Sequence, residues 1–256
     1  MPVLVIPAYN EAENVPRLLD DLERRPSLWR LGKVVLVDDG STDGTPEAAE
    51  AHAGRLPLEV LRLGRNRGPG RAFDAGFHRA LELSGERGLV VTLESDTTSD
   101  LDVLDQMLAT ARDGADIVLA SVHGGGRMLG VGRTRRLMSR GAAFAIRRAA
   151  GLDARTVSSF FRVYRAHALR AGYERHGESF IRESGFACKA EILLKLDALG
   201  ARIAEVPVDL DAARRQGSSK LRLAPTITGY VRLLSRSSLV REPVGSGPLV
   251  RDEAAP

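Results

Sequence analysis

Short apolar runs alternate with segments of helical periodicity along the first half of the chain. Four of these runs have the character of strands buried on both faces: residues 3–6, 33–37, 58–63 and 89–93. Between them, helices are expected from Asn10, which can form a capping box with Glu13, from Thr42 or Asp43, and from Arg71. The alternation predicts an α/β fold with a doubly wound, mostly parallel sheet flanked by helices.

The second half of the chain continues the pattern. Helices are expected over residues 102–113, over the basic segment 133–150 and within 180–200, with strands over 116–121 and 203–208 and a mobile Gly-rich loop over 124–132. Residues 225–240 predict an amphipathic C-terminal helix, which either lies on a membrane surface or packs on its own domain. The polar residues 241–256 predict a disordered tail, so the expected domain covers residues 1–224.

Polar clusters stand where three of the predicted strands end. They are residues 7–11, Asp38-Asp39 and Glu94-Ser95-Asp96. Ligands of doubly wound sheets bind at the carboxyl ends of the strands. Two carboxylates spaced i, i+2 on a turn, as in Glu94 and Asp96, can face one Mg²⁺ or Mn²⁺. A solvated turn is the commoner explanation of such a triplet, so its position directly after an apolar strand carries the argument.

Composition narrows the choice of function. The net charge of +4 suits a polyanionic ligand or an acidic membrane surface without requiring either. Aromatic residues make up 5% of the chain, which argues against a stacking surface for single-stranded nucleic acid. Cys188 is the single cysteine, which excludes an intrachain disulfide and a thiol-rich metal site. With no secretory signal and no apolar run near the ~20 residues of a membrane span, we expect a cytoplasmic protein, with peripheral contact to the inner face of the membrane left open.

Several motifs carry a family resemblance. The strings PAYNE at residues 7–11, VDDGSTDGT at 37–45 and NRGPG at 66–70 resemble family 2 glycosyltransferases of the GT-A (nucleotide-diphospho-sugar transferase) fold. The string SSFFR at 158–162 resembles the S-G-F block of dolichol-phosphate or polyprenol-phosphate mannosyltransferases. The segment from Arg214 to Leu221 resembles their R…G-x-S-K block. The resemblance extends from about residue 3 to about residue 223.

This resemblance implies an inverting enzyme that moves a hexose, mannose favoured, from a nucleoside-diphosphate sugar to a polyprenyl or dolichyl phosphate. It favours GDP-mannose as donor, leaves a UDP-sugar open, and implies a divalent cation, Mg²⁺ or Mn²⁺. Asp96 is implied as the metal ligand with Glu94 as its companion. The residues implied to line the nucleotide are Pro7, Tyr9, Glu11, Val37 and Asp39.

The resemblance also implies residues for the phosphates and the acceptor. Arg135, Arg214 and Lys220 are expected to meet phosphate groups, and Glu191 matches the acid of the late acceptor-side motif. A lipid phosphate is already ionised at neutral pH, so positioning and charge neutralisation suffice for its attack. A hydroxyl acceptor would need a carboxylate base, for which Glu191 and Glu183 are candidates.

Four positions depart from the family pattern. Glu94 stands for the usual Asp, Thr98 for Gln, Val122 for Arg and Ser159 for Gly. They leave open a family 2 enzyme that joins a UDP-sugar to a hydroxyl, and a non-catalytic module that binds sugar nucleotides. A nucleotidyltransferase is disfavoured, because no Gly-rich basic loop follows the first strand. The sequence does not decide the sugar, the base, the acceptor or the oligomeric state.

Overall fold

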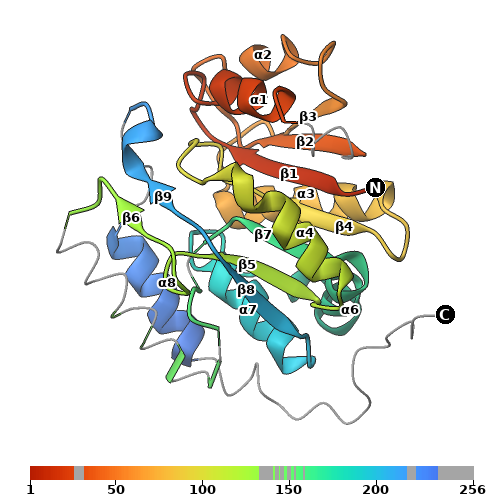
Figure 1. Cartoon of the computed structure of the whole chain (residues 1–256), viewed down its shortest axis with the longest axis vertical. Coiled ribbons are helices and arrows are strands. Elements are labelled where there is room, and N and C mark those ends of the chain that lie inside the picture. Colours follow the sequence, from red (N-terminus) through yellow and green to blue (C-terminus); the bar gives the residue numbers. More distant parts are fainter. Residues whose placement is uncertain are drawn as a thin grey trace.

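The computed structural model describes residues 1–25, 32–132, 141, 144, 147–148, 151–152, 154–157, 159–217 and 223–235. A seven-stranded sheet forms its centre, with the strand order β3-β2-β1-β4-β7-β5-β8 (Figure 1). The strands are β1 Val3–Ala8, β2 Lys33–Asp38, β3 Leu58–Arg62, β4 Leu89–Thr92, β5 Ile117–Ser121, β7 Arg162–Arg165 and β8 Ile203–Pro207. A smaller parallel pair joins β6 Met128–Leu129 to β9 Leu210–Asp211.

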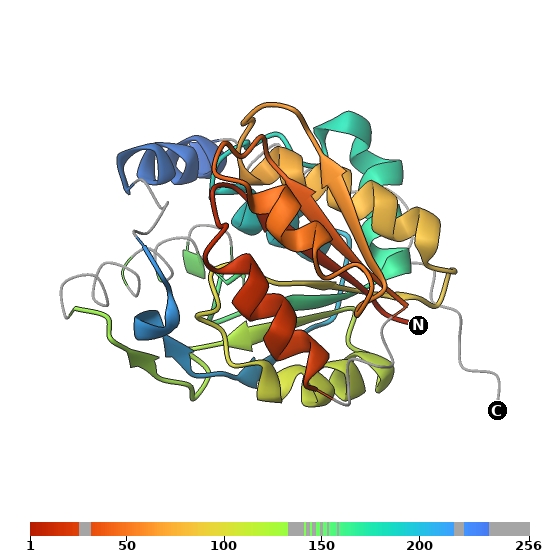
Figure 2. The same ribbon diagram turned by 90° about the horizontal axis from the view of Figure 1, so that it is seen from above.

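Helices cover both faces of the sheet and make a three-layer structure (Figure 2). They are α1 Val15–Glu23, α2 Thr45–Glu50, α3 Pro69–Leu83, α4 Leu104–Arg112, α6 Ala166–His176, α7 Cys188–Ala198 and α8 Leu223–Ser235, with 3-10 turns at Leu101–Val103, Gly177–Ser179 and Ala212–Arg214. One buried cluster joins α3, α6 and α7 to the sheet, and a second joins α1 and α4 to the opposite face. Burial on both faces explains why the central strands are continuous apolar runs.

The predicted α/β fold is confirmed, and within the seven-stranded sheet one strand, β7, was not predicted by the sequence pattern. The pairs β1–β2, β1–β4, β2–β3 and β5–β8 are parallel, whereas β7 is antiparallel to β4 and to β5. The strand β7 has an arginine at each end, so it lacks the apolar signature of its neighbours. Arg162 is nevertheless fully buried, and its guanidinium donates hydrogen bonds to the carbonyls of Val157 and Lys189 at 3.0 and 2.7 Å.

The first helix begins later than predicted. It starts at Val15, with Pro16 in its first turn, where the missing N–H of a proline costs nothing. Asn10 instead has a left-handed backbone with φ 54°, and its side chain bonds the next loop. The capping interaction expected between Asn10 and Glu13 was therefore wrong.

Other boundaries also shift. The Gly-rich segment 124–132, expected as a loop, contains β6, and the C-terminal helix is described over Leu223–Ser235. Within the basic segment 133–150, the described positions 141, 144, 147 and 148 have helical backbone. The tail 241–256 lies outside the described residues. Throughout the described part of the chain, no helix combines the length and apolar character needed to cross a membrane.

Candidate active site

The three polar clusters meet at one edge of the sheet, as the sequence predicted. The strands β2, β1 and β4 are neighbours and parallel, so their carboxyl ends lie side by side. The loops that leave them stay in contact: Asp39 N donates to Ala8 O at 2.9 Å, and Leu93 N donates to Val5 O at 3.1 Å. This edge is where an α/β sheet of this type binds its ligand.

The loops that follow β1 and β2 are joined by backbone-to-side-chain hydrogen bonds. Asn10 N donates to Ser41 Oγ at 2.9 Å, and Thr42 N donates to Asn10 Oδ1 at 2.8 Å. Glu11 N donates to Thr45 Oγ1 at 2.8 Å. The strings PAYNE and VDDGSTDGT thus form one wall, in which each loop supplies acceptors for the amides of the other.

Asp39 holds a third loop against this wall. Its side chain is 2% exposed, and its two oxygens accept the backbone N–H groups of Arg67 and Gly68 at 2.8 and 2.7 Å. Burial raises the pKa of the Asp39 carboxyl above its usual 3.8, although the two hydrogen bonds from backbone N–H groups act to lower this pKa. A carboxylate has about four acceptor positions, so Asp39 can still accept hydrogen bonds from a ribose or a base.

The other residues expected at the nucleotide differ in accessibility. Pro7 and Tyr9 are half-buried, and Glu11 is buried with a hydrogen bond of 2.6 Å from the Asn14 amide. Val37 is fully buried in the core on the α3 side of the sheet. Its side chain therefore faces the core, and only the backbone at this position can meet a nucleotide.

The acidic triplet forms a tight turn around Asp96. Asp96 is 5% exposed, and its Oδ1 accepts hydrogen bonds from Thr98 N at 3.1 Å and from Thr98 Oγ1 at 2.7 Å. Its Oδ2 forms an ion pair with the guanidinium of Arg215. Thr98, which departs from the family pattern, therefore orients the carboxylate, and Glu94 lies half-buried beside it.

The donor set suits a cation that a diphosphate helps to hold. Among the described residues there is no group of three or more His, Cys, Asp or Glu side chains placed to bind a metal. Mg²⁺, however, is commonly held by one or two carboxylates together with substrate phosphates. Asp96 and Glu94 match that arrangement, and the guanidinium on Oδ2 shows that this oxygen accepts positive charge.

Two of the basic residues expected at the phosphates, Arg135 and Lys220, lie outside the described residues. Arg214 is described and pairs with Asp21 at 2.7 Å, and its backbone carbonyl accepts the hydroxyl of Thr97 at 3.0 Å. The structure thus brings Arg214 to the turn that carries Asp96.

Glu191 is buried in the first turn of α7. Its carboxylate accepts hydrogen bonds from the ammonium of Lys195 at 2.5 Å and from the backbone N–H groups of Arg182 and Glu183 at 2.9 and 2.8 Å. With these partners, Glu191 shapes the loop that precedes α7. Glu183, the other candidate base, is 6% exposed and forms an ion pair with Arg232 of α8 at 3.2 Å.

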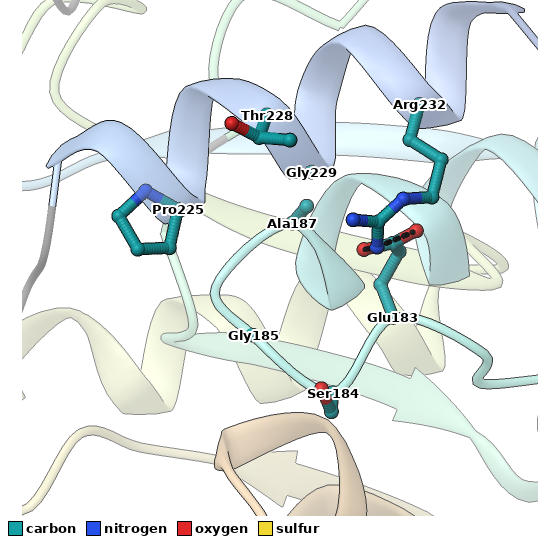
Figure 3. A pocket seen from close by; sticks show the side chains of 8 residues that line it. All are labelled: Glu183, Ser184, Gly185, Ala187, Pro225, Thr228, Gly229 and Arg232. Atoms are coloured by element: carbon teal, nitrogen blue, oxygen red, sulfur yellow. Dashed lines mark hydrogen bonds and ion pairs between the residues drawn. The ribbon is translucent and has the colours of Figure 1, made fainter.

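A pocket of about 490 Å³ lies between this loop and α8 (Figure 3). The Glu183–Arg232 pair stands at one end of it, and Gly185 and Ala187 face Pro225, Thr228 and Gly229 of α8 across it. The close approach depends on Gly229, because a Cβ there would lie 2.9 Å from that of Ala187.

Several residues that the sequence pattern did not single out also lie at the site. Asn14 exchanges two hydrogen bonds with the backbone of Gln216, at 3.0 and 2.9 Å. Lys189 is 6% exposed, and its ammonium lies 4.4 Å from the ring centroid of Phe160. Burial lowers its pKa, and the charge of Glu94 opposes that effect. No local sequence signal singled out Lys189, because α7 also carries Glu191, Lys195 and Asp197.

Comparison with known proteins agrees with this geometry. The family model for glycosyl transferase family 2 matches residues 3–172. Undecaprenyl-phosphate mannosyltransferase of Micrococcus luteus is 31% identical over 219 residues, covering 85% of this chain and 86% of that protein. Dolichol-phosphate mannosyltransferase of Pyrococcus furiosus is 31% identical over 238 residues. These residues cover 91% of this chain and 62% of that protein, so the chain spans less than two thirds of the archaeal relative.

A solved structure supports the fold. Glucosyl-3-phosphoglycerate synthase of Mycobacterium tuberculosis, in complex with Mn²⁺, UDP-glucose and phosphoglyceric acid, superposes with a TM-score of 0.61 at 20% identity. The match covers 94% of this chain and 79% of that one. At this identity the similarity shows the fold alone, which is GT-A. Because the family model also matches more than half of the chain, the chain belongs to glycosyl transferase family 2 and is a glycosyltransferase.

Proposed function

We propose that this chain transfers a hexose, mannose favoured, from a nucleoside-diphosphate sugar to a polyprenyl phosphate, with inversion at the anomeric carbon. The observation that carries the proposal is the placement of Asp39 and Asp96 at the ends of strands on either side of β1. Asp39 is a buried carboxylate that can accept further hydrogen bonds, and Asp96 suits a cation that neutralises a diphosphate. The names of the two bacterial and archaeal relatives favour mannose and a lipid phosphate.

In this proposal the nucleoside lies along the wall of residues 7–11 and 38–45, near Pro7, Tyr9, Glu11 and Asp39. Asp96 with Glu94 would hold a divalent cation, Mg²⁺ or Mn²⁺, which would supply positive charge for the departing diphosphate. Arg135, Arg214 and Lys220 add positive charge for the donor and acceptor phosphates. The acceptor phosphate is ionised at neutral pH, so its oxygen attacks without a general base.

Glu191 acts in this scheme as a positioning residue. Its carboxylate is engaged by Lys195 and by two backbone amides, which fixes the loop carrying Glu183 and Ser184. A family 2 enzyme that uses a UDP-sugar and a hydroxyl acceptor is the second candidate. It is favoured by Glu183, a buried carboxylate that lines the pocket beside α8.

We also propose that α8 contacts the inner face of the membrane while the rest of the chain stays in the cytoplasm. One side of the helix packs on the domain through Gly229 and Leu233, whereas Ile227 and Val231 are 51% and 62% exposed. Packing on the domain and contact with a membrane surface are therefore compatible, because one face of α8 packs on the domain and another presents apolar side chains outward. Peripheral contact would bring the pocket beside α8 near a lipid-linked acceptor.

A transfer assay tests the proposed activity. The full chain is incubated with radiolabelled GDP-mannose or UDP-sugars, a polyprenyl phosphate in detergent, and Mg²⁺, Mn²⁺ or EDTA. We expect butanol-extractable label from GDP-mannose that requires the metal, and we expect Asp96→Asn to lose at least ~100-fold of the rate, as for loss of a major electrostatic group. Label on a hydroxyl acceptor alone would favour the second candidate. Saturable donor binding without turnover would contradict both and favour a binding module.

A further inference from the structure

A segment that crosses the strand ends lies directly over the acidic turn. We call residues 209–217 the strap. Its Asp211 N donates to Thr98 O at 3.0 Å, and Leu210 forms a bridge with Ser99. Thr97 Oγ1 donates to the carbonyl of Arg214 at 3.0 Å. The strap is therefore tied to the residues that immediately follow Asp96.

The strap places Arg215 on Asp96. The two oxygens of this carboxylate have different partners, because Thr98 occupies Oδ1 and the Arg215 guanidinium pairs with Oδ2. The Asp96 side chain is 7% exposed and the Arg215 side chain 22%. A cation that approaches Asp96 through Oδ2 must therefore take the position of this guanidinium.

The other contacts of the strap reach the nucleotide wall. Gln216 exchanges two hydrogen bonds with Asn14, and the Asn14 amide also donates to Glu11. Arg214 pairs with Asp21 on α1. Because these contacts do not involve Asp96, the strap can stay anchored at Asn14 and Asp21 while Arg215 exchanges its partner.

We propose that Arg215 is an internal counter-cation that competes with the divalent cation for Asp96, so that metal binding and release of the strap at Arg215 are one equilibrium. The inference rests on the proposed function, since it takes Asp96 as the metal ligand. The divalent ion carries twice the charge of the guanidinium, and a bound diphosphate can add oxygen ligands to a metal that Asp96 already holds. Once the metal has displaced it from Asp96, the Arg215 guanidinium lies near the bound diphosphate and can donate hydrogen bonds to phosphate oxygens.

This competition has a consequence for the order of events. Without metal, the negative charge of Asp96 is neutralised and the strap closes over the turn. With metal, the contact at Arg215 opens while those at Asn14 and Asp21 persist. Entry of the metal is thus coupled to loss of the Arg215 contact and to local loosening of the strap at that position.

Mn²⁺ binding by the full chain, measured from the electron paramagnetic resonance signal of free Mn²⁺ without nucleotide, tests the proposal. We expect Arg215→Gln to bind Mn²⁺ about 3- to 10-fold more tightly than wild type, and Arg215→Lys to lie between them, as for removal of one partly exposed competing ion pair. Arg17→Gln is the matched control, because it removes the same charge from an exposed position on α1. Equal or weaker Mn²⁺ binding by Arg215→Gln, relative to Arg17→Gln, overturns the proposal.

Asp96→Asn separates this inference from the proposed function. If it leaves Mn²⁺ affinity unchanged in both the wild-type and Arg215→Gln backgrounds, the metal assignment fails and the inference fails with it. If it abolishes Mn²⁺ binding while Arg215→Gln gives no gain, the inference fails alone.

Hydrogen exchange on the wild-type chain provides a second measurement that needs no variant. We expect Mn²⁺ to speed amide exchange in peptides covering 209–217 and to leave peptides of β1 unchanged. Unchanged or slower exchange in the strap at saturating Mn²⁺ would contradict the coupling.

Discussion

The two sides of the strand-end edge are held together by different interactions. On the nucleotide side, formed by residues 7–11, 38–45 and 66–70, backbone amides donate to uncharged or acidic side chains of neighbouring loops. On the acceptor side, formed by 182–191, the strap and α8, four ion pairs predominate. They are Arg215–Asp96, Arg214–Asp21, Arg232–Glu183 and Lys195–Glu191.

This difference separates a preformed surface from one that can rearrange. The hydrogen bonds that backbone N–H groups donate to the Asp39 and Asn10 side chains fix the backbone, and they involve no mobile charged side chain as donor. Ion pairs with partly exposed arginines contribute little net stability and exchange readily for other anions or cations. The Arg214 and Arg232 side chains are 37% and 50% exposed, so both can move toward a substrate phosphate at small cost. We infer that the nucleotide side receives the donor and that the acceptor side closes around the acceptor phosphate.

Breaking the nucleotide side at Asp39 has the largest expected effect. In Asp39→Asn one carboxylate oxygen becomes an NH₂ group that faces a backbone N–H, so a buried donor loses its acceptor. We expect nucleoside-diphosphate affinity to fall by about 30- to 100-fold, as for loss of a buried hydrogen bond to a charged group. Isothermal titration with GDP and UDP in the presence of Mn²⁺ measures it.

Asp105→Asn is the control for this experiment, because it removes one negative charge from an exposed position in the first turn of α4. We expect its nucleotide affinity to equal that of wild type. An Asp39→Asn chain that melts as wild type does and binds nucleotide within threefold of it would show that Asp39 does not hold the nucleotide loop in a binding geometry.

The same contrast explains which parts of the fold could be predicted. The strands β1, β2 and β4 are central, parallel and buried on both faces, so local composition identifies them. The strand β7 has the sequence RVYR and is recognisable only once Arg162 has the carbonyls of Val157 and Lys189 as partners. Val157 lies in the irregular segment just before β7 and Lys189 lies in α7, so no periodic pattern within the strand reports these partners.

The site divides in the same way. Asp39 and Asp96 could be found because each comes soon after an apolar strand, and both of those strands lie next to β1. The contact between Arg215 and Asp96 joins positions more than a hundred residues apart, and Arg215 stands beside the arginine that matches the family motif. Glu191 carried a recognisable motif, but its engagement by Lys195 and two amides depends on the turn before α7.

The two sides meet at Gly70, where we expect the next largest effect. Gly70 N donates to Ser184 O at 2.8 Å, and a Cβ at Gly70 would lie 2.0 Å from Glu183 O. In Gly70→Ala the start of α3 must move away from the acceptor-side loop, so we expect a loss of about 1–3 kcal/mol in the free energy of unfolding. Urea denaturation followed by circular dichroism measures it.

Gly85→Ala provides the matched control for Gly70→Ala, because a Cβ at Gly85 would meet nothing within 4 Å. Its free energy of unfolding should stay within about 0.5 kcal/mol of wild type. Equal stability of the two variants would mean that the two sides are not in close contact at Gly70.

The smallest expected effect concerns acid and the acceptor side. His176 ends α6 and stacks on Phe180, whose carbonyl accepts a hydrogen bond from Lys195 at 3.1 Å. Burial, reinforced by the positive charge of Lys195, lowers the pKa of His176 to about 4 from its usual 6.5. The unfolded chain therefore binds a proton before the folded one does. The stability linked to neutral His176 is complete above pH 6.5 and is lost as the pH falls toward 4.

Replacing His176 with Phe keeps a ring on Phe180 and removes the proton site. Between pH 7 and pH 5 we expect the melting temperature of His176→Phe to fall by roughly 2 °C less than that of wild type, a modest gain because water screens a half-buried ring. His78→Phe, at an exposed ring on α3, should follow wild type. Identical melting curves for wild type and His176→Phe across this range would place the acid sensitivity elsewhere. A smaller fall in the melting temperature of His176→Phe would instead show that protonation of His176 destabilises the wild-type chain in acid. The added charge would lie among the positive charges of Lys195, Arg175 and Arg182.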